Sequence, residues 1–147
     1  MGFVLDTNVY IDAIKDSARA EMLERYYHSF LPFTFLHGIV AQELLAGALD
    51  AQGLRILRKS YVEPFERRNR LVVPDFATWK RTGEVISRMC QRNLVSRGGL
   101  KHSFVRDVVL AVSCRRFGHT LITGNASDFE RITRVEPFDF IPPYPEG

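Results

Sequence analysis

The fold class follows from residues close to the N-terminus, which read Gly2-Phe3-Val4-Leu5-Asp6-Thr7-Asn8-Val9-Tyr10-Ile11. A short apolar run stops at Asp6, and apolar residues then recur with the period of a helix. This pattern predicts a buried strand that ends at Asp6 and a helix that begins with Thr7 or Asn8 as its cap. Because ligands of open α/β sheets bind outside the carboxyl ends of the strands, Asp6 is expected in a functional cleft. The alternative is that Asp6 only caps the helix.

Length and composition point to a single domain over residues 1–147. Of the 147 residues, 46% are hydrophobic, which is enough for a real core. No apolar run approaches the roughly 20 residues of a membrane span, and no basic region precedes the first apolar run as in a signal peptide. Cys90 and Cys114 have no metal-type spacing, so the reducing cytoplasm is the expected compartment.

The rest of the chain alternates between short β-prone runs and longer helical patterns. Strands are expected at residues 3–5, 33–36, 71–73 and 119–123, with an edge strand at Val135. Pro64 should kink or split the helical pattern over residues 51–69, and the proline-rich residues 137–147 should be irregular. Such alternation predicts an α/β fold, in which helices cover both faces of a parallel sheet.

Residues 104–114 form a helical pattern that is apolar on almost every side. Only Arg106, Asp107 and Ser113 interrupt it, and a helix of this kind is buried between other elements. An ionised carboxylate in such a helix needs a partner, because an unpaired buried charge is very costly. A metal ion or the positive end of the helix would supply that partner. Asp107 is therefore the acid that is hardest to explain as surface decoration.

Four acids are expected near the carboxyl ends of strands or early in the helices beside them: Asp6, Glu43, Asp107 and Asp128. We find no basic partner built into the same motifs, so these acids should repel one another. Hard divalent cations relieve such repulsion, and carboxylate oxygens favour Mg²⁺ or Mn²⁺. The sequence therefore predicts a divalent metal site with Asp6, Glu43, Asp107 and Asp128 as its metal ligands.

The chain resembles PIN-domain ribonucleases, and within that group the VapC-type toxins of toxin–antitoxin pairs. The matching pieces are residues 4–8 (VLDTN), 41–44 (AQEL) with Gly47, 106–111 (RDVVLA) and 123–129 (TGNASDF). The resemblance implies a three-layer α/β/α fold around a central parallel sheet of four to five strands. It also implies a Mg²⁺- or Mn²⁺-dependent endoribonuclease that forms homodimers and is neutralised by a small cognate antitoxin protein.

The expected roles follow from this resemblance and from the chemistry of each side chain. Asp6 and Asp107 are expected to bind the principal metal directly, Glu43 to bind it through water or to orient the attacking water. Asp128 completes the site, with Asn125 as the alternative occupant of the fourth position. Thr7, Asn8, Thr123 and Asn125 are expected to orient the ligands or to contact phosphate. A metal-activated water would then cut RNA to leave a 5′-phosphate and a 3′-hydroxyl.

Basic residues beside the acids are expected to guide RNA, because an acidic pocket alone repels phosphate. Arg97, Lys101 and Arg106 are the candidates, whereas His102 is interpreted as a solvated loop residue. Two wider basic groups, in residues 55–70 and 88–101, could hold a phosphate backbone. Each of them is more simply interpreted as a solvated helix face.

Two other functions are compatible with parts of the sequence. Asp6 after a strand could be the nucleophile of a haloacid-dehalogenase-type aspartyl-phosphate phosphohydrolase. That chemistry requires a second Asp two residues later, where this chain has Asn8, and a later Lys that the sequence does not clearly supply. The second alternative is a non-catalytic PIN-like scaffold that binds RNA or the antitoxin without cutting.

Overall fold

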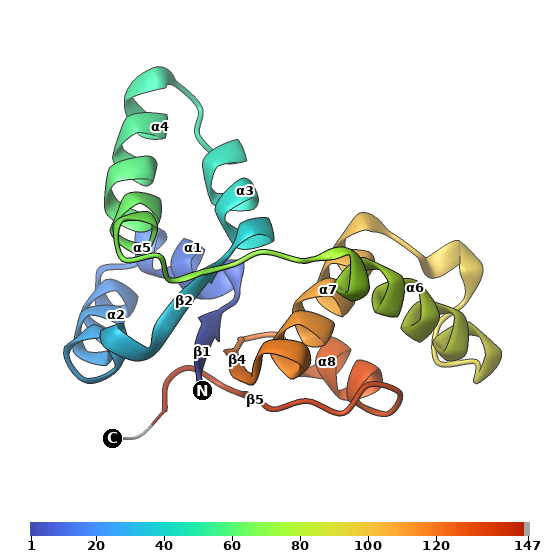
Figure 1. The fold of residues 1–147 in the computed structure, drawn as a ribbon. Helices are drawn as coiled ribbons and strands as arrows, with labels where there is room; N and C mark the ends of the chain where they lie inside the picture. Colours follow the sequence, from blue (N-terminus) through green and yellow to red (C-terminus); the bar gives the residue numbers. More distant parts are fainter. Residues whose placement is uncertain (146–147) are drawn as a thin grey trace.

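A computed structural model describes residues 1–145 of the chain, and a five-stranded sheet lies at its centre. Every strand pair is parallel, and the strand order is β3-β2-β1-β4-β5 (Figure 1). The strands are β1 (Gly2–Leu5), β2 (Thr34–His37), β3 (Leu71–Val72), β4 (His119–Ile122) and β5 (Phe140–Ile141). The predicted parallel sheet is thus confirmed, with five strands.

The chain reverses its direction of winding between β1 and β4. From β1 the chain moves outward to β2 and β3, whereas from β4 it moves the other way to β5. In register, Leu5 lies opposite Ile122, and the Asp6 amide donates a hydrogen bond to the Ile122 carbonyl at 2.9 Å. The carboxyl ends of β1 and β4 therefore meet at the switch point, where open α/β sheets bind ligands.

The elements that connect β1, β2 and β3 lie on one side of the sheet (Figure 1). These elements are α1 (Thr7–Lys15), α2 (Ser17–Phe30), the 3-10 turn Leu31–Phe33, α3 (Gly38–Ala46), α4 (Ala51–Leu57), the π turn Arg58–Val62 and α5 (Glu63–Arg67). Together α4, the π turn and α5 form an arm that projects from the sheet (Figure 1). The helical pattern over residues 51–69 is split as expected, and Pro64 lies in the first turn of α5, where its missing N–H is harmless.

The helices α6 (Phe76–Gln91), α7 (His102–Phe117) and α8 (Ala126–Thr133), with the 3-10 turn Arg97–Gly99, cover the other face (Figure 1). This completes the three-layer α/β/α architecture. Helix α7 is the buried one, because it packs against β4, α6 and α8. Its residues from Asp107 to Cys114 are all buried, as their apolar pattern predicts. Gly118 ends α7 at a φ of 73°, a left-handed conformation that suits glycine.

The structure corrects several local expectations. The cap of α1 is Asp6 itself, whose side chain accepts a hydrogen bond from the Thr7 amide, and not Thr7 or Asn8. The edge strand is Phe140–Ile141 and not Val135, so residues 137–147 are not wholly irregular; residues 146–147 lie outside the described part. Trp79, on α6, is half exposed. Within residues 1–145, no helix combines the length and the apolar character needed to cross a bilayer.

Candidate active site

Asp6 lies where β1 becomes α1 and is held there by a full set of hydrogen bonds. Its Oδ1 accepts from the Thr7 amide at 2.7 Å, while its Oδ2 accepts from the Thr123 hydroxyl at 2.8 Å and from Asn8 Nδ2 at 3.1 Å. The side chain is only 2% exposed. Two strands and the first turn of a helix therefore fix the position of this carboxylate, so Asp6 both caps the helix and faces the switch point.

The Arg106 guanidinium bridges three of the four predicted acids. Its Nη2 donates to Asp6 Oδ1 at 2.6 Å and its Nε to Glu43 Oε1 at 2.5 Å, while Nη1 donates to Asp107 Oδ1. We call this group, Arg106 with Asp6, Glu43 and Asp107, the Arg106 bridge. The expectation that the acids lack a basic partner is therefore wrong. It failed because Arg106 lies 63 positions from Glu43 and 100 from Asp6, so that these pairings depend on the fold and not on a local pattern.

Glu43 and Thr7 close the side of the site that lies against α3. The Thr7 hydroxyl donates to Glu43 Oε1 at 2.7 Å and accepts from Arg106 Nη2 at 3.0 Å. Glu43 is 37% exposed, in contrast to the nearly buried Asp6 and Asp107. Among the three acids, Glu43 is therefore the one most exposed to solvent.

Asp107 lies in the first two turns of α7, and its side chain is only 4% exposed. Burial raises the pKa of its carboxyl to about 7, and the negative charges of Asp6 and Asp128 act in the same direction against the attraction of Arg106. For Arg106, burial lowers the pKa, but the charge of Asp6 and the hydrogen bonds to the acids outweigh it and hold the pKa above its usual range. The site therefore contains more negative charge than one guanidinium neutralises.

Asp128 joins the site through a chain of hydrogen bonds. Asn125 Nδ2 donates to Asp128 Oδ2 at 2.8 Å, and the Asn125 amide donates to the Thr123 hydroxyl at 3.0 Å, which in turn binds Asp6. Asp128 also pairs with Arg131 at 2.9 Å, and the hydrogen bond from Asn125 lowers its pKa. Asp128 and Asn125 are thus hydrogen-bonded to each other, and Asn125 is the one that contacts the Thr123 hydroxyl.

Asn8 connects the loop that follows β4 to the start of α1 by hydrogen bonds. Its side-chain carbonyl accepts a hydrogen bond from the Gly124 amide at 3.1 Å, while its Nδ2 reaches Asp6. Thr7, Asn8, Thr123 and Asn125 therefore all lie in the hydrogen-bond network around Asp6. Such a network orients carboxylates before they bind a ligand.

The donor set suits a hard divalent cation, because it consists of carboxylate oxygens. Within the described residues, however, no three or more His, Cys, Asp or Glu side chains are arranged to hold one ion. In this structure the Arg106 guanidinium pairs with one oxygen each of Asp6, Glu43 and Asp107. The residues fit a divalent cation by the chemistry of their oxygens.

The three basic residues expected to guide RNA lie in different settings. Arg106 is inside the acidic site, whereas Arg97 and Lys101 are exposed before and at the start of α7. Lys101 and Asp128 line the same pocket, which has a volume of about 450 Å³. Lys101 thus lies on the same pocket as Asp128, while Arg97 lies earlier in the same loop. His102 is exposed, as expected of a solvated residue.

The sequence interpretation missed His37, which joins the end of β2 to α3 and α7. His37 ends β2, is fully buried and caps α3 by accepting a hydrogen bond from the Ile39 amide on Nδ1 at 3.0 Å. Its Nε2 meets the Ser113 hydroxyl at 2.9 Å, so the polar interruption of α7 at Ser113 has a partner on β2. Burial lowers the pKa of His37 to about 4. The signal was present in Ser113, but its partner could not be read from sequence.

The PIN domain family matches residues 3–135, which is most of the chain. The chain belongs to the PIN domain family. Its fold is similar to that of a chain of DNA-bound VapBC from Salmonella typhimurium, with a TM-score of 0.71 and 21% identity over 97% of this chain and 98% of the other.

Two further solved structures have the same fold as this PIN domain. A chain of VapBC-1 from nontypeable Haemophilus influenzae has a TM-score of 0.66 and 22% identity, over 97% of this chain and 98% of the other. A chain of FitAcB from Neisseria gonorrhoeae has a TM-score of 0.69 and 17% identity, over 95% of this chain and 96% of the other. Among curated proteins, no sequence matches. At these low identities, the TM-scores show a common fold and nothing more.

Proposed function

We propose that this PIN domain is a Mg²⁺- or Mn²⁺-dependent endoribonuclease that serves as the toxin of a toxin–antitoxin pair. The observation that carries the proposal is the meeting of Asp6, Glu43 and Asp107 around a single guanidinium at the carboxyl ends of β1 and β4. Acids from three separate segments converge there, with Asp128 linked through Asn125 and Thr123. Such excess negative charge at a buried site is costly unless the site binds cations.

In this proposal the residues have separate tasks. Asp6 and Asp107 would hold the cation directly, while the more exposed Glu43 would orient the attacking water and Asp128 would complete the site. A bound divalent cation would supply an acidified water and positive charge for the scissile phosphate. The hydroxyls of Thr7 and Thr123 and the amides of Asn8 and Asn125 keep the carboxylates oriented. Lys101, Arg97 and Arg106 would bring the RNA backbone to these acids.

The partner in this proposal is a small antitoxin protein. Structures of the same fold carry the names VapBC and FitAB, and some are described as bound to promoter or other DNA. By analogy, we propose that an antitoxin covers the acidic site of this chain with a basic segment and binds DNA with it. The pair would act in the cytoplasm, where the RNA substrate is found.

We also propose that the chain forms a homodimer, because exposed apolar residues recur between β3 and α6, of which Trp79 lines a groove with Glu43 and Arg106. Leu71, Val73, Phe76 and Trp79 are all exposed, and Phe76 is 82% exposed. Large exposed apolar patches mark interaction sites. Phe76→Ser should shift the sedimentation coefficient to that of a monomer, whereas Ile56→Ser, at an exposed apolar residue of α4, should not.

Asp6→Asn tests the catalytic proposal, because it removes one ligand charge with almost no change in volume. Cleavage of RNA by the purified protein in Mn²⁺ should fall by about 100-fold or more, while the circular dichroism spectrum and melting temperature stay close to wild type. Unchanged cleavage would contradict the metal site. Trapping of phosphate on Asp6 would support the phosphohydrolase instead, and a wild-type protein that binds RNA without cutting it would support the scaffold.

A further inference from the structure

The Arg106 bridge joins one guanidinium to three carboxylates, so its positive and negative charges do not balance. Nε, Nη1 and Nη2 of Arg106 each donate to a different acid, so all three nitrogens are engaged. When the three acids are ionised, the group has a formal charge of −2. One cationic side chain therefore satisfies hydrogen bonds of the site without neutralising it, and the site still attracts a further cation.

Arg106 takes one oxygen of each acid. On Asp6 it binds Oδ1, whereas Oδ2 is bound by Thr123, which follows β4, and by Asn8 in the first turn of α1. The loss of Arg106 would leave Asp6 in place, because the contacts of Thr7, Thr123 and Asn8 remain. Asp6 is thus held in position independently of the guanidinium, and Glu43 keeps its contact with the Thr7 hydroxyl. The guanidinium is the part that can leave.

The surroundings of Arg106 give it room to move. Its side chain is 18% exposed and lines a groove of about 420 Å³ together with Glu43, Trp79 and His102. Arg106 lies in the first two turns of α7, so rotation of its long side chain requires no movement of the helix. A guanidinium that swings into this groove remains beside the acids, where its fork of donors fits a phosphate.

We propose that Arg106 is an exchangeable counter-ion of the acidic site, which a divalent cation displaces and which then binds a phosphate of the substrate. The side chain thereby occupies the carboxylates while the site lacks a cation and reduces their affinity for one. After exchange, the same guanidinium contributes to substrate binding from the rim of the groove. The second half of this inference rests on the proposed nuclease function, whereas the first half does not.

The first test is a calorimetric titration of the purified chain with Mn²⁺ alone. Arg106→Gln should bind Mn²⁺ at least about tenfold more tightly than wild type, because the competing contacts are removed. Lys80→Gln is the matched control, since it removes one positive charge from an exposed residue of α6 outside the acidic site. Affinity that is unchanged or weaker in Arg106→Gln would overturn the proposal, as would an equal gain in Lys80→Gln.

Melting temperature gives a second reading that does not depend on activity. Without metal, Arg106→Gln should be less stable than wild type, because it leaves Asp6 and Asp107 without their cation. Mn²⁺ should then raise the melting temperature of Arg106→Gln more than that of wild type. If Arg106→Gln does not fold, Arg106→Lys replaces it, because lysine retains the charge but cannot reach three carboxylates as a fork. An Arg106→Lys variant with wild-type Mn²⁺ affinity would overturn the proposal.

RNA cleavage at saturating Mn²⁺ tests the second half. Arg106→Gln should cut about tenfold or more slowly than wild type even though it binds Mn²⁺ more tightly, because it lacks the phosphate contact. Cleavage at the wild-type rate would overturn the role in substrate binding. If wild type itself does not cut RNA, the proposed function fails, and the Mn²⁺ titration of the same samples still decides the exchange of Arg106.

Discussion

Two clusters of arginine and carboxylate in this molecule are built with opposite proportions. In the Arg106 bridge, one arginine serves three acids at the carboxyl ends of the strands. In the second cluster, the single acid Glu136 binds Arg81 through two hydrogen bonds of 3.1 Å and Arg115 through one of 3.0 Å. We call this second group the Glu136 cluster. It joins α6 and α7 to the segment that leads to β5.

The proportions indicate different purposes. Glu136 is 3% exposed and has two cations to compensate its charge, so the Glu136 cluster is a closed arrangement that stabilises the fold. The Arg106 bridge remains acidic after pairing and is open to solvent at Glu43. An excess of like charge lowers stability and is retained where binding or catalysis requires it. Mutations should therefore reduce activity in one cluster and stability in the other.

Asp107→Asn should separate these two effects most clearly. Removal of this ligand charge is expected to lower RNA cleavage by about 100-fold or more. The free energy of unfolding at pH 8 should stay the same or increase, because burial makes the ionised Asp107 unfavourable and raises its pKa to about 7. Urea denaturation beside the cleavage assay measures both. A variant that is several kcal/mol less stable than wild type would show that Asp107 is mainly structural.

The difference between the clusters also explains what the sequence could predict. The acids of the site follow short apolar runs or lie in a helix that is buried on all sides, and these are local patterns. Asp6 and Asp107 were therefore predicted, as was the parallel sheet. The partners could not be predicted, because Arg106 reaches residues 63 and 100 positions away and Arg81 reaches Glu136 across 55 positions.

Edge elements and caps escaped prediction for a related reason. The two residues of β5 carry no period, and only their pairing with β4 makes them a strand. In the sequence, His37 looks like the end of an ordinary strand, and its partner Ser113 lies in helix α7. In each case the deciding contact is between segments far apart in sequence, which composition and spacing do not report.

The pH dependence of stability offers a second test, because two buried groups near the site oppose each other. His37 has a lowered pKa of about 4 against an ordinary value of 6.5, so the unfolded chain binds more protons between these pH values and stability rises with pH. Asp107 has a raised pKa of about 7, so the folded chain retains its proton and stability falls as pH rises from about 4 to 7.

Asp107→Asn should expose the contribution of His37. In this variant the free energy of unfolding is expected to increase by roughly 3 kcal/mol as pH rises from 4 to 6.5, since a shift of one pKa unit corresponds to about 1.4 kcal/mol. Denaturation series at several pH values in Asp107→Asn and in the double variant with His37→Gln would measure it. If both variants have the same slope, His37 is not the group that titrates.

Glu136→Gln should lower the free energy of unfolding, by a smaller amount, and should leave cleavage unaffected. The substitution leaves Arg81 and Arg115 without their shared carboxylate, but these arginines are 28% and 49% exposed and can be solvated. We therefore expect about 2 kcal/mol of destabilisation, below the 3–5 kcal/mol of a fully buried pair. Cleavage per folded molecule should not change. Glu130→Gln, at an exposed residue of α8, is the control, and an equal loss there would mean that the Glu136 cluster adds nothing special.

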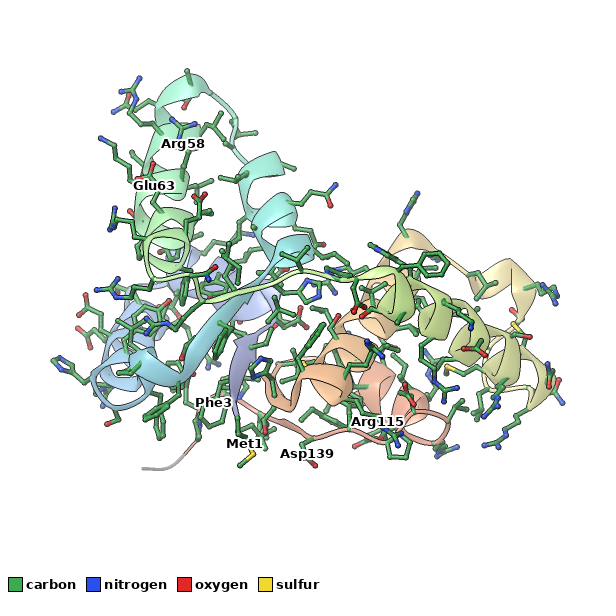
Figure 2. The ribbon with its side chains drawn as sticks, viewed as in Figure 1. Met1, Phe3, Arg58, Glu63, Arg115 and Asp139 are labelled. Atoms are coloured by element: carbon green, nitrogen blue, oxygen red, sulfur yellow. The ribbon has the colours of Figure 1, made fainter. Side chains whose placement is uncertain are left out.

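The smallest effect is expected at an ion pair that has neither burial nor an excess of charge. Arg58 and Glu63 lie on the projecting arm, far from Arg115 (Figure 2), with 3.8 Å between Arg58 Nε and Glu63 Oε1. Their side chains are 48% and 35% exposed, so water screens the attraction. Glu63→Gln should change the free energy of unfolding by less than about 0.5 kcal/mol and leave cleavage unchanged. A loss as large as that of Glu136→Gln would mean that proximity alone, and not burial, determines the value of an ion pair in this fold.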